Sequence, residues 1–221
     1  MSSTAKQSFD KNIKDVARLL ELHTQEGGTG SGRRHGLEVL NKSAIVLITA
    51  YWEAYCEDVA AEALRHILRH AKSPDRLPER LKKRIAKEVK GAPHELEVWK
   101  LAGSGWKSYL TNRLEILQQE RNRKLNTPKA DNIDELFVEV LEIPKISSSW
   151  RWQGMNTDQA VQKLNEYVTL RGDIAHRGRH SKSIHRTKVE DFLTFAQTLA
   201  QKTDGHVNTY VKQITKGKAL W

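Results

Sequence analysis

Apolar residues recur every three or four positions along most of this chain of 221 residues, a spacing that places them on one face of an α-helix. Sustained alternation of apolar and polar residues, which would indicate a half-buried β-strand, is nearly absent. We therefore predict an all-α fold. The pattern places long helices over about residues 8–25, 37–71, 157–176 and 188–213, and additional short helices over about 78–90, 95–102, 106–122 and 133–141.

The segment over residues 37–71 is apolar on nearly every side from Ala44 to Tyr55. A helix with this pattern is buried, so we expect it to be the long central helix of a bundle. It should end before Pro74, because proline disfavours helical conformation in the residue that precedes it. We expect a single helical domain over residues 1–221, with an N-terminal helix and glycine-rich loop over 1–36, a core over 37–213 and a tail over 214–221.

Two helices begin with sequences that are typical of a capping box. Asn156 is followed three residues later by Gln159, and Thr187 is followed three residues later by Glu190. In a capping box each side chain accepts a hydrogen bond from the backbone amide of the other residue, which satisfies donors that the first helical turn leaves free. We expect these boxes to start the helices over 157–176 and 188–213.

The charge balance is strongly basic. The chain has 37 lysine and arginine residues against 27 aspartate and glutamate residues, which gives a formal net charge of +10. An excess of positive charge favours an anionic partner such as RNA, although many soluble basic proteins bind no particular polyanion.

The number of cysteines and the length of the apolar stretches indicate the cellular compartment of the protein. Cys56 is the single cysteine of the sequence, which excludes an internal disulfide and fits a reducing cytoplasm. We expect it to be a small buried core residue. The sequence shows no secretory signal, and its most apolar stretch, residues 44–52, is too short to span a bilayer. These features predict a soluble, cytoplasmic protein with no membrane partner.

Arg171 is an unusual residue for its position. It falls on the same helical face as Ala160, Leu164, Val168 and Ala175 in the segment over 157–176. A guanidinium on an apolar face is costly unless an anion or a hydrogen-bond partner meets it. The position therefore makes Arg171 a candidate functional residue.

His176 follows Arg171 after four intervening residues and precedes Gly178, a residue suited to ending the helix. A histidine, with a reference pKa of ~6.5, suits proton transfer, and the planar fork of an arginine suits a phosphate. RNA supplies its own nucleophile, the 2′-hydroxyl, so these two residue types suffice for metal-free cleavage. Residues five apart are rotated by about 140° around a helix, so one helix alone makes a poor site and a two-fold dimer would make a better one.

Three further stretches accompany the Arg-(four residues)-His spacing. They are AYWEAYCEDVAAE at residues 50–62, NTP at 126–128 with NIDELF at 132–137, and SWRW at 149–152. In this order they resemble the RiboL-PSP branch of the HEPN superfamily. The resemblance implies a HEPN-type helical bundle and a metal-independent endoribonuclease. It further implies a toxin or anti-phage defence effector that cleaves single-stranded RNA at a composite site between two protomers.

The resemblance makes Arg171 and His176 the candidate catalytic residues. Gly172 departs from the family's pattern, because HEPN ribonucleases often carry a polar residue, commonly Asn, directly after the motif arginine. Asp173 is the nearest polar substitute and joins the candidate set, whereas Gly172 is expected to serve close packing against another helix. The loop after the motif supplies a basic rim for the RNA backbone, with Arg177, Arg179, His180, Lys182 and Arg186 as candidate RNA-binding residues.

Two alternatives stand beside the ribonuclease. One is a non-catalytic HEPN module that binds RNA, a nucleotide or a partner protein, which the glycine at position 172 favours. The other is a structural interaction domain with a basic surface. We expect neither a metal nor a cofactor, because the motif has no cluster of carboxylates around it. The partners that we expect are RNA and a second copy of the chain, with an antitoxin or a sensor protein as a further candidate.

Overall fold

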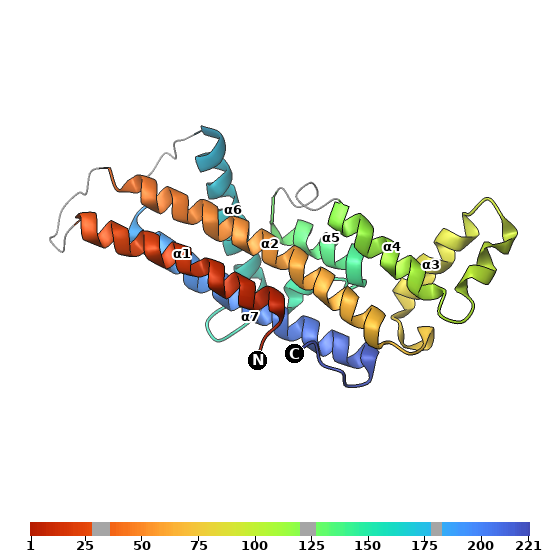
Figure 1. Cartoon of the computed structure of the whole chain (residues 1–221). Helices are drawn as coiled ribbons and strands as arrows, with labels where there is room; N and C mark the ends of the chain where they lie inside the picture. The colour runs from red at the N-terminus through yellow and green to blue at the C-terminus, as the bar shows by residue number, and fades with distance from the viewer. Residues whose placement is uncertain (28–35, 120–126, 178–182) are drawn as a thin grey trace.

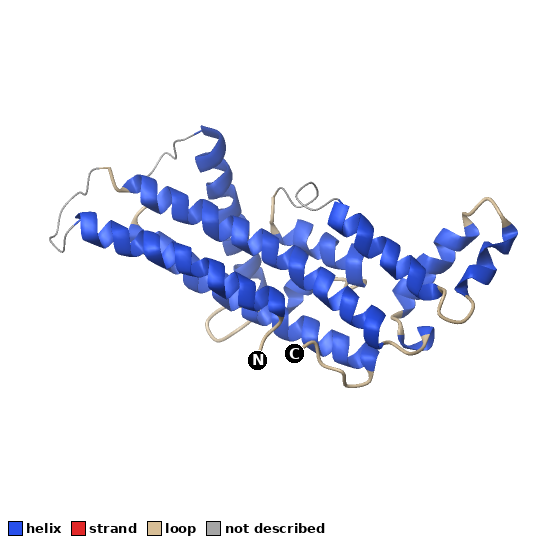
Figure 2. Ribbon diagram, viewed as in Figure 1, coloured by secondary structure: helices blue, strands red, loops and turns tan. Residues whose placement is uncertain are grey.

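The computed structural model describes residues 1–27, 36–119, 127–177 and 183–221, with some side chains beside the gaps left out. This part of the chain is built from α-helices and short 3₁₀ helices and contains no strand, which confirms the predicted all-α fold (Figure 2). In chain order the elements are α1 (Thr4–Gly27), α2 (Glu38–His70), η1 (Pro74–Arg76), α3 (Glu79–Lys90), η2 (Glu95–Leu101), α4 (Trp106–Gln119), α5 (Ala130–Leu141), η3 (Ile146–Ser149), α6 (Thr157–Arg177) and α7 (Arg186–Thr215).

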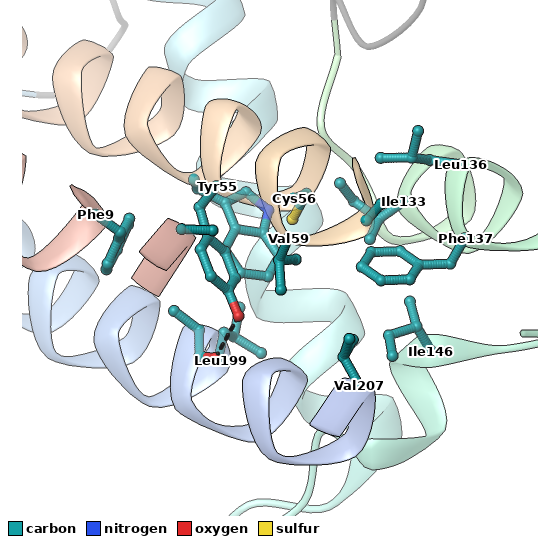
Figure 3. Close-up of a cluster of buried hydrophobic side chains, with 14 of the residues drawn as sticks. Phe9, Tyr55, Cys56, Val59, Ile133, Leu136, Phe137, Ile146, Leu199 and Val207 are labelled. Atoms are coloured by element: carbon teal, nitrogen blue, oxygen red, sulfur yellow. Dashed lines mark hydrogen bonds between the residues drawn. The ribbon is translucent and has the colours of Figure 1, made fainter. Parts of the chain in front are cut away.

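The long helix α2 is the centre of the bundle, as its apolar pattern predicts. It contacts α1, α4, α5, α6 and α7 (Figure 1). Tyr55 and Cys56 of α2 lie among apolar side chains that α1, α5 and α7 supply (Figure 3). The expectation that Cys56 is buried is therefore confirmed.

The irregular segment before α6 completes the core. Trp150 is fully buried, and its ring meets that of Trp52 edge-on, with centroids 5.8 Å apart. Its indole N–H donates a hydrogen bond to the hydroxyl of Thr203 on α7, at 2.9 Å. Trp150 therefore joins α2 to α7 through one apolar ring and one satisfied donor, as is usual for a buried tryptophan.

One of the two predicted capping boxes is present. The amides of Asn156 and Gln159 each donate to the side chain of the other residue, both at 2.9 Å, at the start of α6. The box predicted at the start of α7 is wrong, because this helix already begins at Arg186. Glu190 instead accepts a hydrogen bond from Nε of Arg186 at 2.7 Å.

Helix α1 is fastened to the bundle at its N-terminal end. The backbone amides of Thr4 and Ala5 donate to the two carboxylate oxygens of Glu62 on α2, at 3.0 and 2.9 Å. The hydroxyl of Ser3 donates to the buried carboxylate of Asp204 on α7. These two carboxylates satisfy amides and a hydroxyl at the helix start, where backbone donors lack partners within the helix.

Candidate functional site

Arg171 lies on the face of α6 that packs against α2. The preceding positions of this face, Ala160, Leu164 and Val168, are buried, and Arg171 is half-buried. The sequence-based expectation that Arg171 shares the apolar face is confirmed. The expectation for Ala175 is wrong, because Ala175 is exposed and Ile174 is the buried residue of that turn. Seven residues rotate a helix by about 700°, so Ala175 still points nearly the same way as Val168, and its exposure shows that the described residues leave this end of the face uncovered.

The guanidinium of Arg171 is incompletely satisfied. Its Nε atom is shielded from solvent and has no hydrogen-bond partner among the residues that the structure describes. A buried polar group without a partner costs about 1–3 kcal/mol, and more when it is charged. Such a cost at a candidate site is consistent with a donor kept for a ligand.

Glu53 of α2 lies near enough to Arg171 to be affected by its charge, and Glu57 on the same helix also acts on Glu53. Glu53 and Glu57 are one helical turn apart, and only 6% of Glu57 is exposed. Burial and the charge of Glu57 raise the pKa of Glu53 to about 7, while the charge of Arg171 lowers it and only partly offsets the increase. The charge of Arg171 therefore acts on one carboxyl group of α2, that of Glu53, whose pKa lies near neutral pH.

The pair of glutamates, Glu53 and Glu57, was not predicted from the sequence. The signal was present, because Glu53 and Glu57 are charged residues four apart inside the most apolar stretch of the central helix. Burial of two like charges on one face needs a compensating cation from another element. The sequence does not show that α2 packs on α6, and this packing brings the charge of Arg171 close to Glu53.

Asp173 is not brought to Arg171. It lines an open groove on another side of α6, together with Glu166, Thr169, Leu170 and Lys188. Residues two apart are rotated by about 200° around a helix, so Arg171 and Asp173 point in nearly opposite directions. Within one chain, Asp173 and Arg171 therefore lie on different sides of α6.

His176 belongs to the last turn of α6, and Arg177 is its final residue. Their backbone is described, whereas their side chains are not. Arg179, His180 and Lys182 lie outside the described residues. The convergence of His176 with Arg171 and the RNA-binding role of the basic rim therefore stay predictions.

Arg186 is tied into the fold. It begins α7, where its guanidinium donates to Glu190 at 2.7 Å and to the hydroxyl of Thr24 on α1. A phosphate would have to compete with both partners for this side chain. Its clearest contribution is to join α1 to α7.

Gly172 has space around it. A Cβ atom built at this position would meet no atom within 4 Å among the described residues. None of the described residues packs closely on Gly172, so the expectation that it permits close approach of another helix is not met among them and stays a prediction for a second copy of the chain.

The described residues offer neither a metal-binding cluster nor a membrane-spanning helix. The described residues contain no group of three or more histidine, cysteine, aspartate or glutamate side chains that could hold a metal ion. Glu62, His66 and His70 follow one another at intervals of four along α2, but Glu62 accepts hydrogen bonds from the backbone amides of α1, and the ring of His66 meets the Lys218 carbonyl at 3.2 Å. No helix in the described ranges has the length and apolar character needed to cross a bilayer.

Comparison with known proteins gives one match. The family model described as RiboL-PSP-HEPN matches residues 9–209, which include all of α2 to α6 and most of α1 and α7. No curated protein and no solved structure gives a significant match.

Proposed function

The chain belongs to the RiboL-PSP-HEPN family, and from this premise we propose that it is a metal-independent endoribonuclease that cleaves single-stranded RNA. The family assignment itself points to an RNA-related, nuclease-type role, and HEPN domains often bind RNA and dimerise. The excess of positive charge on the chain is consistent with such a substrate.

The observation that carries the proposal is the state of Arg171. A guanidinium is held on the buried face of α6 with its Nε unpartnered among the described residues. Five positions later, His176 occupies the last turn of the same helix. A cation with a donor still available, next to a residue suited to proton transfer, is the pair of groups that RNA cleavage requires.

The proposed reaction uses the RNA's own 2′-hydroxyl. Its oxygen attacks the adjacent phosphorus, and its proton passes to a base. The bond from phosphorus to the 5′-oxygen breaks, an acid protonates that oxygen, and the products carry a 2′,3′-cyclic phosphate and a 5′-hydroxyl. His176 performs proton transfer, and Arg171 stabilises the charge that develops on the phosphate oxygens.

Two copies of the chain compose the proposed site. Within one helix, side chains five residues apart are rotated by about 140°, so Arg171 and His176 of one chain diverge. A two-fold axis beside α6 brings the arginine of one protomer toward the histidine of its partner. We further propose that the enzyme acts as a toxin or an anti-phage effector, with an antitoxin or sensor protein as its regulator.

The test is cleavage of a 5′-labelled single-stranded RNA by the purified chain in the presence of EDTA. We expect products that end in a 2′,3′-cyclic phosphate. His176→Ala should slow cleavage by about 10²–10⁴-fold. Arg18→Ala is the matched control, because Arg18 is an exposed residue of α1 that pairs with Glu21. Cleavage that vanishes in EDTA and returns with magnesium, or that is unchanged in His176→Ala, would overturn the proposal.

The non-catalytic alternative also has an observation in its favour. Gly172 occupies the position where HEPN ribonucleases often have a polar residue, and the space around it would accept a side chain. A chain of this kind would bind RNA without cutting it. Binding of the labelled RNA without any cleavage across pH 5–9 would favour this alternative.

A further inference from the structure

The segment from α3 to the turn before α4 forms a lobe at one end of the molecule, which we call the distal lobe (residues 79–105; right of Figure 1). Its 3₁₀ helix, η2, packs mainly against α3. Helix α6, which carries Arg171, packs instead on α2, α5 and η3. The distal lobe is therefore a surface separate from the proposed cleavage site.

The apolar side chains of η2 are exposed to solvent. Leu96 is 73% exposed, Val98 is 53% exposed and Trp99 is 73% exposed. A 3₁₀ helix has three residues per turn, so Leu96 and Trp99 lie on the same side of η2. Glu97 and Lys100, which are also three residues apart, pair at 2.6 Å and neutralise each other. The helix η2 therefore presents an apolar edge that contains an exposed indole ring.

The turn after η2 holds this edge in place. The amide of Ala102 donates to the carbonyl of Trp99, and the amide of Gly105 donates to the carbonyl of Ala102, both at 3.0 Å. A Cβ atom at Gly105 would lie 1.7 Å from the carbonyl oxygen of Lys100, so this turn requires glycine. Leu101 is partly buried against the core. An aromatic ring on an ordered backbone loses less conformational freedom when a ligand stacks on it.

The exposed side of α3 is strongly basic. The helix has two glutamates and six cations, all exposed, and the cations are Arg80, Lys82, Lys83, Arg84, Lys87 and Lys90. Lys83 pairs with Glu79 at 2.6 Å, and Arg84 lies near Glu88 and Glu142. The other four cations have no ion pair within the part of the chain that the structure describes. Because α3 and η2 are in contact, a cationic helix flanks the apolar edge.

We propose that the distal lobe is a second binding site for single-stranded RNA, in which a base stacks on Trp99 and neighbouring phosphates contact the unpaired cations of α3. The choice of RNA as the ligand rests on the proposed function. The lobe binds a stretch of the strand that is separate from the stretch at Arg171. It contributes affinity for the substrate and takes no part in the chemical step.

Single-stranded RNA matches both features of the lobe. It exposes flat base faces beside negatively charged phosphates, and proteins bind it by combining aromatic stacking with a basic surface. A purely apolar partner would leave the cations of α3 without a counterpart. A second copy of the chain would bring a lobe of like charge to them, which is unfavourable. The apolar edge and the cations together therefore favour RNA at this surface.

The first experiment tests stacking. A fluorescent single-stranded RNA with 2′-O-methyl groups, which lacks the nucleophile, is titrated with the full chain, and every variant also carries Arg171→Ala so that the proposed cleavage site does not determine the result. Trp99→Leu keeps an apolar side chain without a ring and should raise the Kd by roughly 5- to 100-fold. Trp99→Phe should restore most of the affinity. An unchanged Kd in Trp99→Leu, or equal Kd values for the two variants, would overturn the proposal and leave a protein as the occupant of the edge.

The second experiment tests the cations. Lys87→Gln combined with Lys90→Gln should reduce the slope of log affinity against log salt by about 1.4, because each phosphate contact of a single strand contributes about 0.7. Lys11→Gln combined with Lys14→Gln is the matched control, since these two lysines are also exposed and three residues apart, on α1. The control should leave the slope unchanged. Equal reductions in the two double variants would overturn the assignment of the phosphates to α3.

Cleavage kinetics separate this inference from the proposed function. With a cleavable RNA long enough to reach both surfaces, Trp99→Leu in the otherwise unchanged chain should raise KM and leave kcat unaltered. A fall in kcat without a change in KM would overturn the binding role of the lobe. If the wild type does not cleave RNA, the ribonuclease proposal fails, whereas binding that depends on Trp99 and on the lysines of α3 still supports the lobe.

A further measurement guards against variants that do not fold. Titration of the Arg171→Ala chain with the 2′-O-methyl RNA should quench tryptophan fluorescence, because a base stacks on the exposed ring of Trp99. A strand of the same length without bases should not quench it. Trp99→Phe should lose the quenching while it keeps most of the affinity. Quenching that persists in Trp99→Phe, or that the strand without bases also produces, would overturn the proposed stacking.

Discussion

Two half-buried arginines, Arg113 and Arg171, stand in different charge surroundings. At the junction of α3, α4 and α5, Arg113 and Arg84 share one carboxylate, that of Glu142, at 3.6 and 3.4 Å. At the contact of α2 and α6, burial and the charge of Glu57 raise the pKa of Glu53, and the charge of Arg171 lowers it. Glu88 also pairs with Arg84, at 3.9 Å, so the first cluster joins two guanidiniums and two carboxylates, whereas the second contains a carboxyl group whose pKa lies near neutral pH.

The difference lies in whether the charge of each cluster can change near neutral pH. Burial and the charge of Arg84 lower the pKa of Arg113, but an arginine in a protein does not lose its proton in this range. The cluster of Arg113 therefore keeps its charge and serves as a fixed connection between helices. A carboxylate can accept a proton, and burial raises the pKa of Glu53 to about 7. The cluster of Arg171 can therefore change its charge.

The largest expected effect separates the two arginines by activity. Arg171→Ala should reduce RNA cleavage by about 10²–10³-fold, because it removes a donor to the charge that develops on the phosphate. Arg113→Ala should leave the rate per folded molecule unchanged and lower the stability instead. Cleavage rates and urea unfolding curves of both variants measure the contrast. Equal losses of activity would remove the functional distinction between the clusters.

The next effect separates the clusters by stability. Glu142→Gln should lower the free energy of unfolding by about 1–3 kcal/mol, because it removes the charge of the buried carboxylate that Arg113 and Arg84 share. Glu142 is itself only 8% exposed. Glu53→Gln should cost less or stabilise the protein, since it removes one of two repelling carboxylates. Urea unfolding at pH 7.5 measures both, with Glu79→Gln as the exposed control. A larger loss in Glu53→Gln than in Glu142→Gln would contradict this assignment.

Much of the fold could be predicted from local pattern. The apolar stripe located α6 and placed Arg171 on its buried face, and the pair Asn156 and Gln159 gave the helix start. The start of α7 was missed because Arg186 already lies in helix and takes Glu190 as its partner. A capping sequence marks the start of a helix only where its first residue lies outside that helix.

The polar clusters could not be predicted in the same way. Arg113 and Glu142 are far apart in sequence, and no spacing rule relates them. Glu53 and Arg171 meet because α2 packs on α6, which is a property of the tertiary fold. The sequence shows each of these residues as a charged residue within an apolar pattern. It does not show which of them meet in the fold.

A smaller effect concerns the residue next to Arg171. Gly172→Ala should raise the free energy of unfolding by about 1 kcal/mol, because alanine favours helix over glycine by this amount. The added Cβ would meet open space among the described residues. Thermal or urea unfolding measures the gain, and Gly91→Ala, at the end of α3, provides a comparison outside the helix interior. A loss of stability, or a gain that vanishes in the dimer, would show that a second molecule packs on Gly172.

The smallest expected effect is a dependence of stability on pH that belongs to the Arg171 cluster alone. The pKa of Glu53 is raised from 4.5 to about 7 in the folded chain, so the folded state binds the proton more tightly than the unfolded state does. Stability from this group is therefore fully present below pH 4.5 and is lost as the pH rises to about 7. The loss should stay below about 1 kcal/mol, because solvent screens a half-exposed group. Urea unfolding of the wild type and Glu53→Gln at pH 5, 6, 7 and 8 isolates the contribution as the difference between the two curves. Glu142→Gln should lower the wild-type curve without changing its slope in this range, since its arginine partners keep their protons. If the slope depends on Glu142 and not on Glu53, the two clusters have been assigned the wrong way round.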